Sequence, residues 1–246
     1  MNITQIKLEN FTVFKNAEIN FDKGINIFIG ENGTGKTHIM KLLYSACQAA
    51  NPKVSFSNKV VRTMLPDDFK ISRLITRIRG SNSANVKISA RMDENTPTKN
   101  LSIDFNHKTK KWDAIVRGEE TWEKNFKDIS SIFIPAKEIL SNSYNLTAAV
   151  EKDNVRFDDT YIDIINSAKV DISVGRNSVN RDNRLKAIEK IIDGTVYYDN
   201  KKDEFYLKKG NSKQEFNLVA EGIRKMALLW QLVKNGTLEK GSVLFW

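Results

Sequence analysis

The sequence predicts a mixed α/β fold, and three observations support this class. An apolar run at residues 25–29 is followed by a glycine-rich loop and then by helical periodicity to about Ala50. Short alternating segments separated by turn residues, at residues 2–21 and 86–105, indicate antiparallel strands. An apolar stripe at residues 218–236 indicates an amphipathic helix. Mixed strand and helix patterns of this kind are typical of an α/β protein.

Composition narrows the class further. The 246 residues are 40% hydrophobic and 28% charged, which suits one large domain or two small ones. No apolar run approaches the roughly 20 residues of a membrane span, and residues 1–5 lack a signal pattern, so we expect no membrane partner and a cytoplasmic location. The single cysteine, Cys47, excludes an intramolecular disulfide and a cysteine-cluster metal site.

The net charge of +9, from 39 Lys+Arg against 30 Asp+Glu, permits binding to DNA or another polyanion without requiring it. The most basic region lies at residues 91–117 and includes Trp112. It could contact a nucleic-acid backbone, but lysines that protect the edge of a sheet explain it as well, and we favour that interpretation.

The first fifty residues predict a hairpin, a strand, a loop and a helix. Residues 2–11 and 14–21 alternate as two antiparallel strands, and residues 25–29 read as a buried strand. The spacing Gly30-x-x-x-x-Gly35-Lys36-Thr37 then gives the P-loop pattern between a strand and a helix.

The chemistry of this pattern points to ATP with Mg²⁺. Its glycines let backbone N–H groups converge on phosphate oxygens, and the following helix adds its positive end. Lys36 can reach the β- and γ-phosphates, and the Thr37 hydroxyl can ligate Mg²⁺. A glycine-rich turn with a chance Lys-Thr is the alternative, which both flanks disfavour. The candidate nucleotide-binding residues here are Asn32, Gly33, Thr34, Gly35, Lys36, Thr37 and His38.

The middle of the chain predicts an antiparallel β-layer and then helices. Helical spacing occurs at 67–79, 157–168 and 184–193. Strands are expected at 86–92, 101–105, 112–116 and 129–134, followed by a hairpin at 195–198 and 204–207 and a possible third strand at 214–218.

The phrase I-K-L-E-N-F-x-x-F-K, followed by I-G-E-N-G-T-G-K-T, resembles the ABC-type head domains of SMC and recombination-repair ATPases. It is most similar to bacterial AAA-family ATPases of the overcoming-lysogenisation-defect type. The resemblance implies a P-loop NTPase fold of ABC-head type, with a core sheet flanked by helices, an antiparallel β-layer and a short helical insertion. It implies that Phe14 and Lys15 contact the adenine side, although Phe14 could simply pack and Lys15 could be solvated.

The same resemblance gives a role to the start of the 218–236 helix, which reads A-E-G-I-R-K. It is similar to the ABC signature motif, whose helix N-terminus holds the ATP of a partner subunit. Ala220, Glu221 and Gly222 would occupy these positions, with Ala220 in place of the usual serine, and they imply a homodimer through composite ATP sites. The alternative is an amphipathic helix with a glycine near its cap.

Two family features are missing from the sequence. The switch glutamine after the 129–134 strand is absent, and Lys137 and Glu138 are the nearest polar candidates. No heptad series for a coiled-coil arm is present, which favours a compact module.

The Walker B carboxylates are missing as well. Residues 243–246 resemble the apolar strand that precedes the Walker B Asp-Glu pair, and this pair is not among the 246 residues. We therefore expect a truncated chain with an incomplete core sheet that binds ATP and hydrolyses it poorly, with no catalytic residue assigned.

These predictions combine into a single ATPase head over residues 1–246. Its expected parts are the hairpin and P-loop (1–50), the β-layer (51–128), a core strand with helices (129–194), and a hairpin, signature helix and Walker B strand (195–246). The resemblance implies control of a DNA transaction or of a partner such as a nuclease or another effector, in DNA repair or anti-phage defence. A non-catalytic nucleotide-dependent module and a DNA-binding β-rich module with a vestigial P-loop are the alternatives; the intact Lys36-Thr37 argues against the last.

Overall fold

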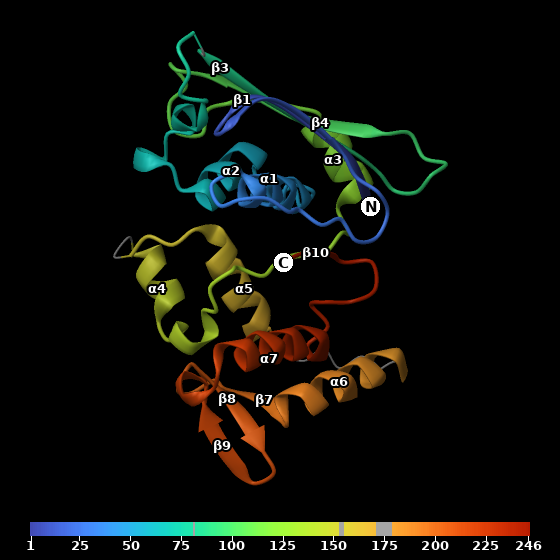
Figure 1. Cartoon of the computed structure of the whole chain (residues 1–246), viewed down its shortest axis with the longest axis vertical. Helices are drawn as coiled ribbons and strands as arrows, with labels where there is room; N and C mark the ends of the chain where they lie inside the picture. Colours follow the sequence, from blue (N-terminus) through green and yellow to red (C-terminus); the bar gives the residue numbers. More distant parts are fainter. Residues whose placement is uncertain (81, 153–154, 171–178) are drawn as a thin grey trace. The chain divides into compact units, whose positions relative to one another are not determined.

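The computed structural model describes residues 1–80, 82–152, 155–170 and 179–246. Its internal contacts divide the chain into two compact units, shown with their elements in Figure 1. The first unit holds residues 1–131 with Phe245, and the second holds residues 132–244 with Trp246. The fold is mixed α/β with an antiparallel sheet, as the sequence predicts.

The first unit is built on a five-stranded antiparallel sheet in the order β2-β1-β3-β4-β5. The predicted N-terminal hairpin is confirmed, with Ile6 opposite Ile19 and Leu8 opposite Ala17. It joins the later strands in one sheet, because β1 pairs with β3 along its other edge. The strands are β1 (Asn2–Phe11), β2 (Phe14–Asn20), β3 (Ser83–Arg91), β4 (Lys99–Asn106) and β5 (Ile115–Arg117).

Alternation along these strands places one apolar face against helices α1 (Lys36–Gln48), α2 (Phe56–Met64) and α3 (Glu119–Phe126), which lie on the same side of the sheet in Figure 1. The indole Nε1 of Trp122 donates to the carbonyl of Ala46 at 2.8 Å and so links α3 to α1. The buried strand residues include Ile6, Leu8, Val86, Ile88, Leu101 and Ile103.

The predicted helix at residues 67–79 is wrong. Two short 3₁₀ turns, η1 (Asp67–Phe69) and η2 (Ile71–Leu74), stand there instead. Asp68 has a positive φ of 54°, which interrupts a right-handed helix. The backbone beyond it pairs with β1, since Thr76 N donates to the Asn10 carbonyl at 2.8 Å. Apolar spacing alone did not distinguish this arrangement from a helix.

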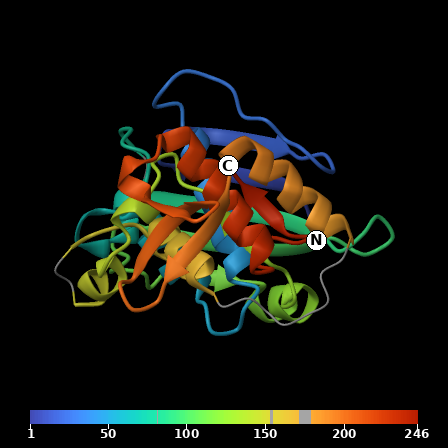
Figure 2. The ribbon, with the colours of Figure 1, turned by 90° about the horizontal axis from the view of Figure 1, so that it is seen from below.

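The predicted buried strand at residues 25–29 is also wrong. This stretch belongs to a long segment without regular structure between β2 and α1, drawn in blue at the top of Figure 2. Ile25, Ile27 and Ile29 are 88%, 79% and 89% exposed. A buried strand needs neighbouring strands for its backbone groups, and no strand of the described residues pairs with this one.

The second unit confirms most of the predicted elements. Its three-stranded antiparallel sheet runs in the order β7-β8-β9, from Thr195–Asp199, Glu204–Lys209 and Ser212–Glu215. The short strands β6 (Ser131–Phe133) and β10 (Val243–Phe245) form a separate pair. The remaining elements are α4 (Leu146–Glu151), α5 (Asp159–Lys169), α6 (Val179–Ile192), α7 (Glu221–Lys234), η3 (Leu140–Asn142) and η4 (Phe216–Leu218).

Helix α7 supplies much of the core of this unit. Its residues Ala227, Leu228, Leu232 and Val233 are buried with apolar side chains of α5, α6 and β8. Across the described residues, no helix is long and apolar enough to span a bilayer.

Candidate nucleotide-binding site

The P-loop adopts a conformation that its glycines make possible. Gly30, Gly33 and Gly35 have φ values of 148°, 83° and 93°, in the region where residues with a Cβ are strained. The loop is open to solvent from Gly30 to Thr34, and Gly35 leads directly into α1. The spacing of the glycines in the sequence is therefore matched by the backbone turns that a phosphate-binding loop needs.

Lys36 lies back across this loop. Its Nζ donates to the carbonyl oxygens of Gly30 and Glu31 at 2.8 and 2.6 Å, and Thr34 Oγ1 donates to the Glu31 carbonyl at 2.9 Å. These contacts hold an ammonium group over the mouth of the loop. Because its partners among the described residues are two neutral carbonyls, phosphate oxygens can compete for the same ammonium.

The N-terminus of α1 leaves its first amides available. Gly35 occupies the N-cap position, and no side chain in the described part of the chain caps the helix. The first N–H groups of a helix have no partner within it, and they carry the positive end of the helix dipole. Thr37 is exposed in this first turn, and no hydrogen bond engages its hydroxyl in the described part of the chain. The Thr37 hydroxyl therefore fits a Mg²⁺ ion that is held by nucleotide phosphates.

The turn between β1 and β2 lies against the P-loop. A Cβ built on Gly35 would come within 2.5 Å of Phe14 Cζ and 2.7 Å of Val13 Cγ2, so these side chains pack directly on the loop. Thr12 Oγ1 lies 3.0 Å from His38 Nδ1 and joins the same turn to α1. The structure therefore brings Phe14 to the P-loop, while Lys15 remains exposed on β2.

His38 is half-buried in this contact. Burial, together with the positive charge of Lys41, lowers the pKa of His38 below its usual value of 6.5. The imidazole is thus neutral near pH 7, and one ring nitrogen can share a hydrogen bond with Thr12. His38 ties the β1–β2 turn to α1.

The second predicted element, Ala220 to Gly222, opens helix α7 in the second unit. Ala220 is the N-cap residue with extended backbone angles, and among the described residues no side chain caps this helix. Ala220, Glu221 and Gly222 are all exposed. Glu221 Oε1 lies 3.6 Å from Nζ of Lys225, one turn further along the helix. This helix N-terminus is thus accessible to a ligand, as a signature motif requires.

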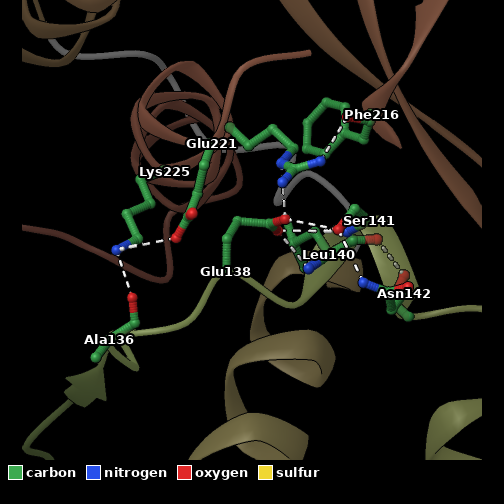
Figure 3. Close-up of polar contacts among 10 residues, drawn as sticks. Ala136, Glu138, Leu140, Ser141, Asn142, Phe216, Glu221 and Lys225 are labelled. Carbon is green, nitrogen blue, oxygen red and sulfur yellow. Dashed lines mark hydrogen bonds and ion pairs between the residues drawn. The ribbon is translucent and has the colours of Figure 1, made fainter. Parts of the chain in front are cut away.

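Sequence reasoning named Glu138 only as a candidate and did not name its partner. The structure buries Glu138, shown in Figure 3, and pairs it with Arg224 of α7. Lys137 is exposed. Glu138 and Arg224 are 86 positions apart in the chain, so no local sequence pattern predicts the pair. Among the described residues, no group of three His, Cys, Asp or Glu side chains could hold a metal ion.

Residues 5–227 match the profile of the AAA domain family. The chain belongs to this family. The match covers most of the chain, including the P-loop and the first turns of α7, and it confirms the resemblance to an AAA-family ATPase head.

Curated relatives match over shorter stretches. The DNA replication and repair protein RecF of Clostridium kluyveri is 39% identical over 61 residues, covering 25% of this chain and 17% of RecF. RecF of Streptococcus gordonii is 29% identical over 91 residues, covering 37% of this chain and 25% of RecF. The matched part of the chain thus spans at most about a quarter of these relatives.

Two solved structures share a weak overall likeness. One, described as concerning ATP-driven dimerization and DNA-stimulated activation of SMC ATPases, has a TM-score of 0.37 at 17% identity, over 51% of this chain and 77% of that one. The other, the recombination mediator RecF with ATP, has a TM-score of 0.40 at 14% identity, over 77% of this chain and 46% of that one.

Proposed function

We propose that this chain is an ATP-binding P-loop module of an ATPase that acts in DNA repair or recombination. The observation that carries the proposal is the P-loop itself, where three glycines with positive φ precede an uncapped helix and Lys36 lies over the loop. Thr37 would ligate the Mg²⁺ that accompanies the nucleotide. The AAA family match and the RecF relatives support the pathway.

The module associates with a second copy in a head-to-tail homodimer. Each copy contributes its P-loop, with Phe14 and Lys15 beside the adenine, and receives the Ala220–Gly222 turn of its partner on the γ-phosphate. The exposed, uncapped N-terminus of α7 supports this role. The dimer regulates a DNA transaction or an effector such as a nuclease, in DNA repair or in anti-phage defence.

Binding rather than turnover is the expected activity of residues 1–246. Phosphoryl transfer needs groups that position water and neutralise developing charge. The sequence has two Asp-Glu pairs, Asp93-Glu94 after β3 and Asp203-Glu204 before β8, and each has a carboxylate engaged in an ion pair, Glu94 with Lys23 and Asp203 with Lys169. A non-catalytic, nucleotide-dependent interaction module is therefore the second candidate function for this chain.

The decisive experiment is titration calorimetry of Mg·ATP against the wild-type chain and Lys36→Ala. We expect the variant to lose at least about 3 kcal/mol of binding free energy, roughly 100-fold in affinity, because a charge-assisted phosphate contact disappears. Lys41→Ala is the matched control, since Lys41 lies on the same helix and its Nζ donates to the Thr63 carbonyl instead. Equal affinity in wild type and Lys36→Ala refutes the nucleotide site.

A separate experiment tests the DNA partner. Binding of duplex DNA to the ATP-loaded chain, measured at several salt concentrations, should weaken steeply with salt if phosphate contacts carry it. Binding that is absent at low salt removes DNA as a direct ligand and leaves an effector protein as the partner.

A further inference from the structure

The segment that follows β6 contains a buried carboxylate. The side chain of Glu138 is 1% exposed. Its Oε1 accepts hydrogen bonds from the backbone amides of Leu140 and Ser141, and Oε2 accepts one from Ser141 Oγ at 2.8 Å (Figure 3). A buried charge is costly unless it is paired and hydrogen-bonded, so this carboxylate is held by its surroundings in one position.

The charge that balances Glu138 comes from the first turns of α7. Arg224 Nε lies 3.0 Å from Glu138 Oε2, as an ion pair without the alignment of a hydrogen bond. Arg224 Nη1 donates to the carbonyl of Phe216 at 3.1 Å. One guanidinium therefore joins the segment after β6, helix α7 and the turn η4 that precedes it.

A second contact strengthens the same junction. Lys225, the next residue of α7, donates from Nζ to the carbonyl of Ala136 and lies 3.6 Å from Glu221 (Figure 3). Two consecutive basic residues thus contact one short segment, since Arg224 pairs with the Glu138 carboxylate and Lys225 donates to the Ala136 carbonyl. The exposed Ala220–Gly222 turn begins about one helical turn before Arg224.

We infer that the Glu138–Arg224 pair is a positioning device that fixes the N-terminus of α7 for the ATP of a partner subunit. This inference rests on the proposed function of the Ala220–Gly222 turn. A buried carboxylate with one opposite charge has one preferred geometry, because a rotation of α7 would leave Glu138 without that charge. Glu138 and Arg224 touch no nucleotide; they act through the turn they hold.

The test uses Glu138→Gln in the full 246-residue chain. Glutamine can still accept from the Leu140 and Ser141 amides, but it leaves Arg224 without an opposite charge. We expect ATP-dependent dimerisation, followed by analytical ultracentrifugation, to weaken about tenfold, while the affinity of the P-loop for Mg·ATP is unchanged. Glu189→Gln is the control. Trp230 Nε1 donates to Glu189 Oε1 at 3.0 Å, so Glu189 also contacts α7, but beyond the first turns of this helix.

The double variant Glu138→Gln/Arg224→Gln separates positioning from folding stability. The double variant buries no unpaired charge, so we expect its unfolding temperature to be higher than that of Glu138→Gln and closer to wild type. We expect its dimerisation to remain as weak as that of Glu138→Gln. If dimerisation recovers together with stability, the single variant acted through unfolding and the inference is overturned.

Hydrogen exchange of the unliganded chain gives a readout that does not depend on dimerisation. Glu138→Gln should speed exchange in the segment from Ala136 to Ser143 and at the α7 amides from Arg224 onward, whose hydrogen bonds begin with Arg224 N to the Ala220 carbonyl, and leave α1 unchanged. If exchange at these α7 amides is unchanged, the pair does not position the start of the helix. If the wild-type chain binds Mg·ATP but never dimerises, the proposed trans function fails, and with it the role of the turn that the pair positions.

Discussion

Helices α1 and α7 both present an uncapped N-terminus to solvent, yet the two ends are built in opposite ways. The α1 end is formed by a glycine loop whose backbone has positive φ at Gly30, Gly33 and Gly35. The α7 end follows an alanine with ordinary extended angles. It is held by the ion pair between Arg224 and Glu138. The first depends on backbone conformation, and the second depends on charge pairing.

This difference predicts where each end tolerates change. At the α1 end a single added methyl group meets Phe14, because the loop and the β1–β2 turn are packed together. At the α7 end a Cβ on Gly222 has no atom within 4 Å. Substitutions at the α1 end should therefore lower the stability of the fold. Substitutions at the α7 end should change only the binding of a ligand.

The largest expected effect comes from Gly35→Ala. The new Cβ lies 2.5 Å from Phe14 Cζ at a φ of 93°, so both strain and a clash oppose it. We expect a loss of about 2–4 kcal/mol in unfolding free energy and at least a tenfold loss in Mg·ATP affinity, measured by urea denaturation and calorimetry.

Gly33→Ala provides the matched comparison for that variant. Gly33 has a similar φ of 83°, but a Cβ there meets nothing within 4 Å. Only strain of about 1–2 kcal/mol should remain. Equal costs at both positions would show that packing of the β1–β2 turn on Gly35 contributes nothing.

Gly222→Ala should have a smaller effect on the fold, of opposite sign. Alanine is a better helix former than glycine, and the φ of Gly222 is not in the left-handed region, so stability should rise by up to about 1 kcal/mol. ATP-dependent association should weaken several-fold if phosphate approaches this turn closely. Unchanged association in a stabilised variant contradicts a trans role for the turn.

Sequence patterns predicted an element correctly where the segment itself contains the signals for its start, period and end. The β1–β2 hairpin, α1 and α7 lie close to the predicted bounds, since alternation, glycine stops and apolar stripes are local signals. Helix α2 was missed although Ser55 caps it, with its side chain accepting from Asn58 N. Its nine residues are too few to show a clear period, so the cap was the better signal.

The failures share one cause, which is that burial depends on partners elsewhere in the chain. The 25–29 run has strand composition, but no described strand pairs with it and three isoleucines are exposed. In the candidate site, the P-loop spacing could be read directly, because its geometry is encoded in consecutive residues. The Glu138–Arg224 pair could not, because its two members meet only after folding.

The smallest expected effect is a pH dependence at the α1 end. Burial and Lys41 lower the pKa of His38, so the unfolded chain binds a proton near pH 6.5 more readily than the folded chain does. The stability that neutral His38 contributes is therefore present above pH 6.5 and is lost as the pH falls through the lowered folded-state pKa. Thermal unfolding between pH 7.5 and 5 should show this decline in wild type and less of it in His38→Gln, which cannot titrate but can still bond to Thr12. Identical declines would assign the acid sensitivity to other groups and remove His38 as the titrating link between the β1–β2 turn and α1.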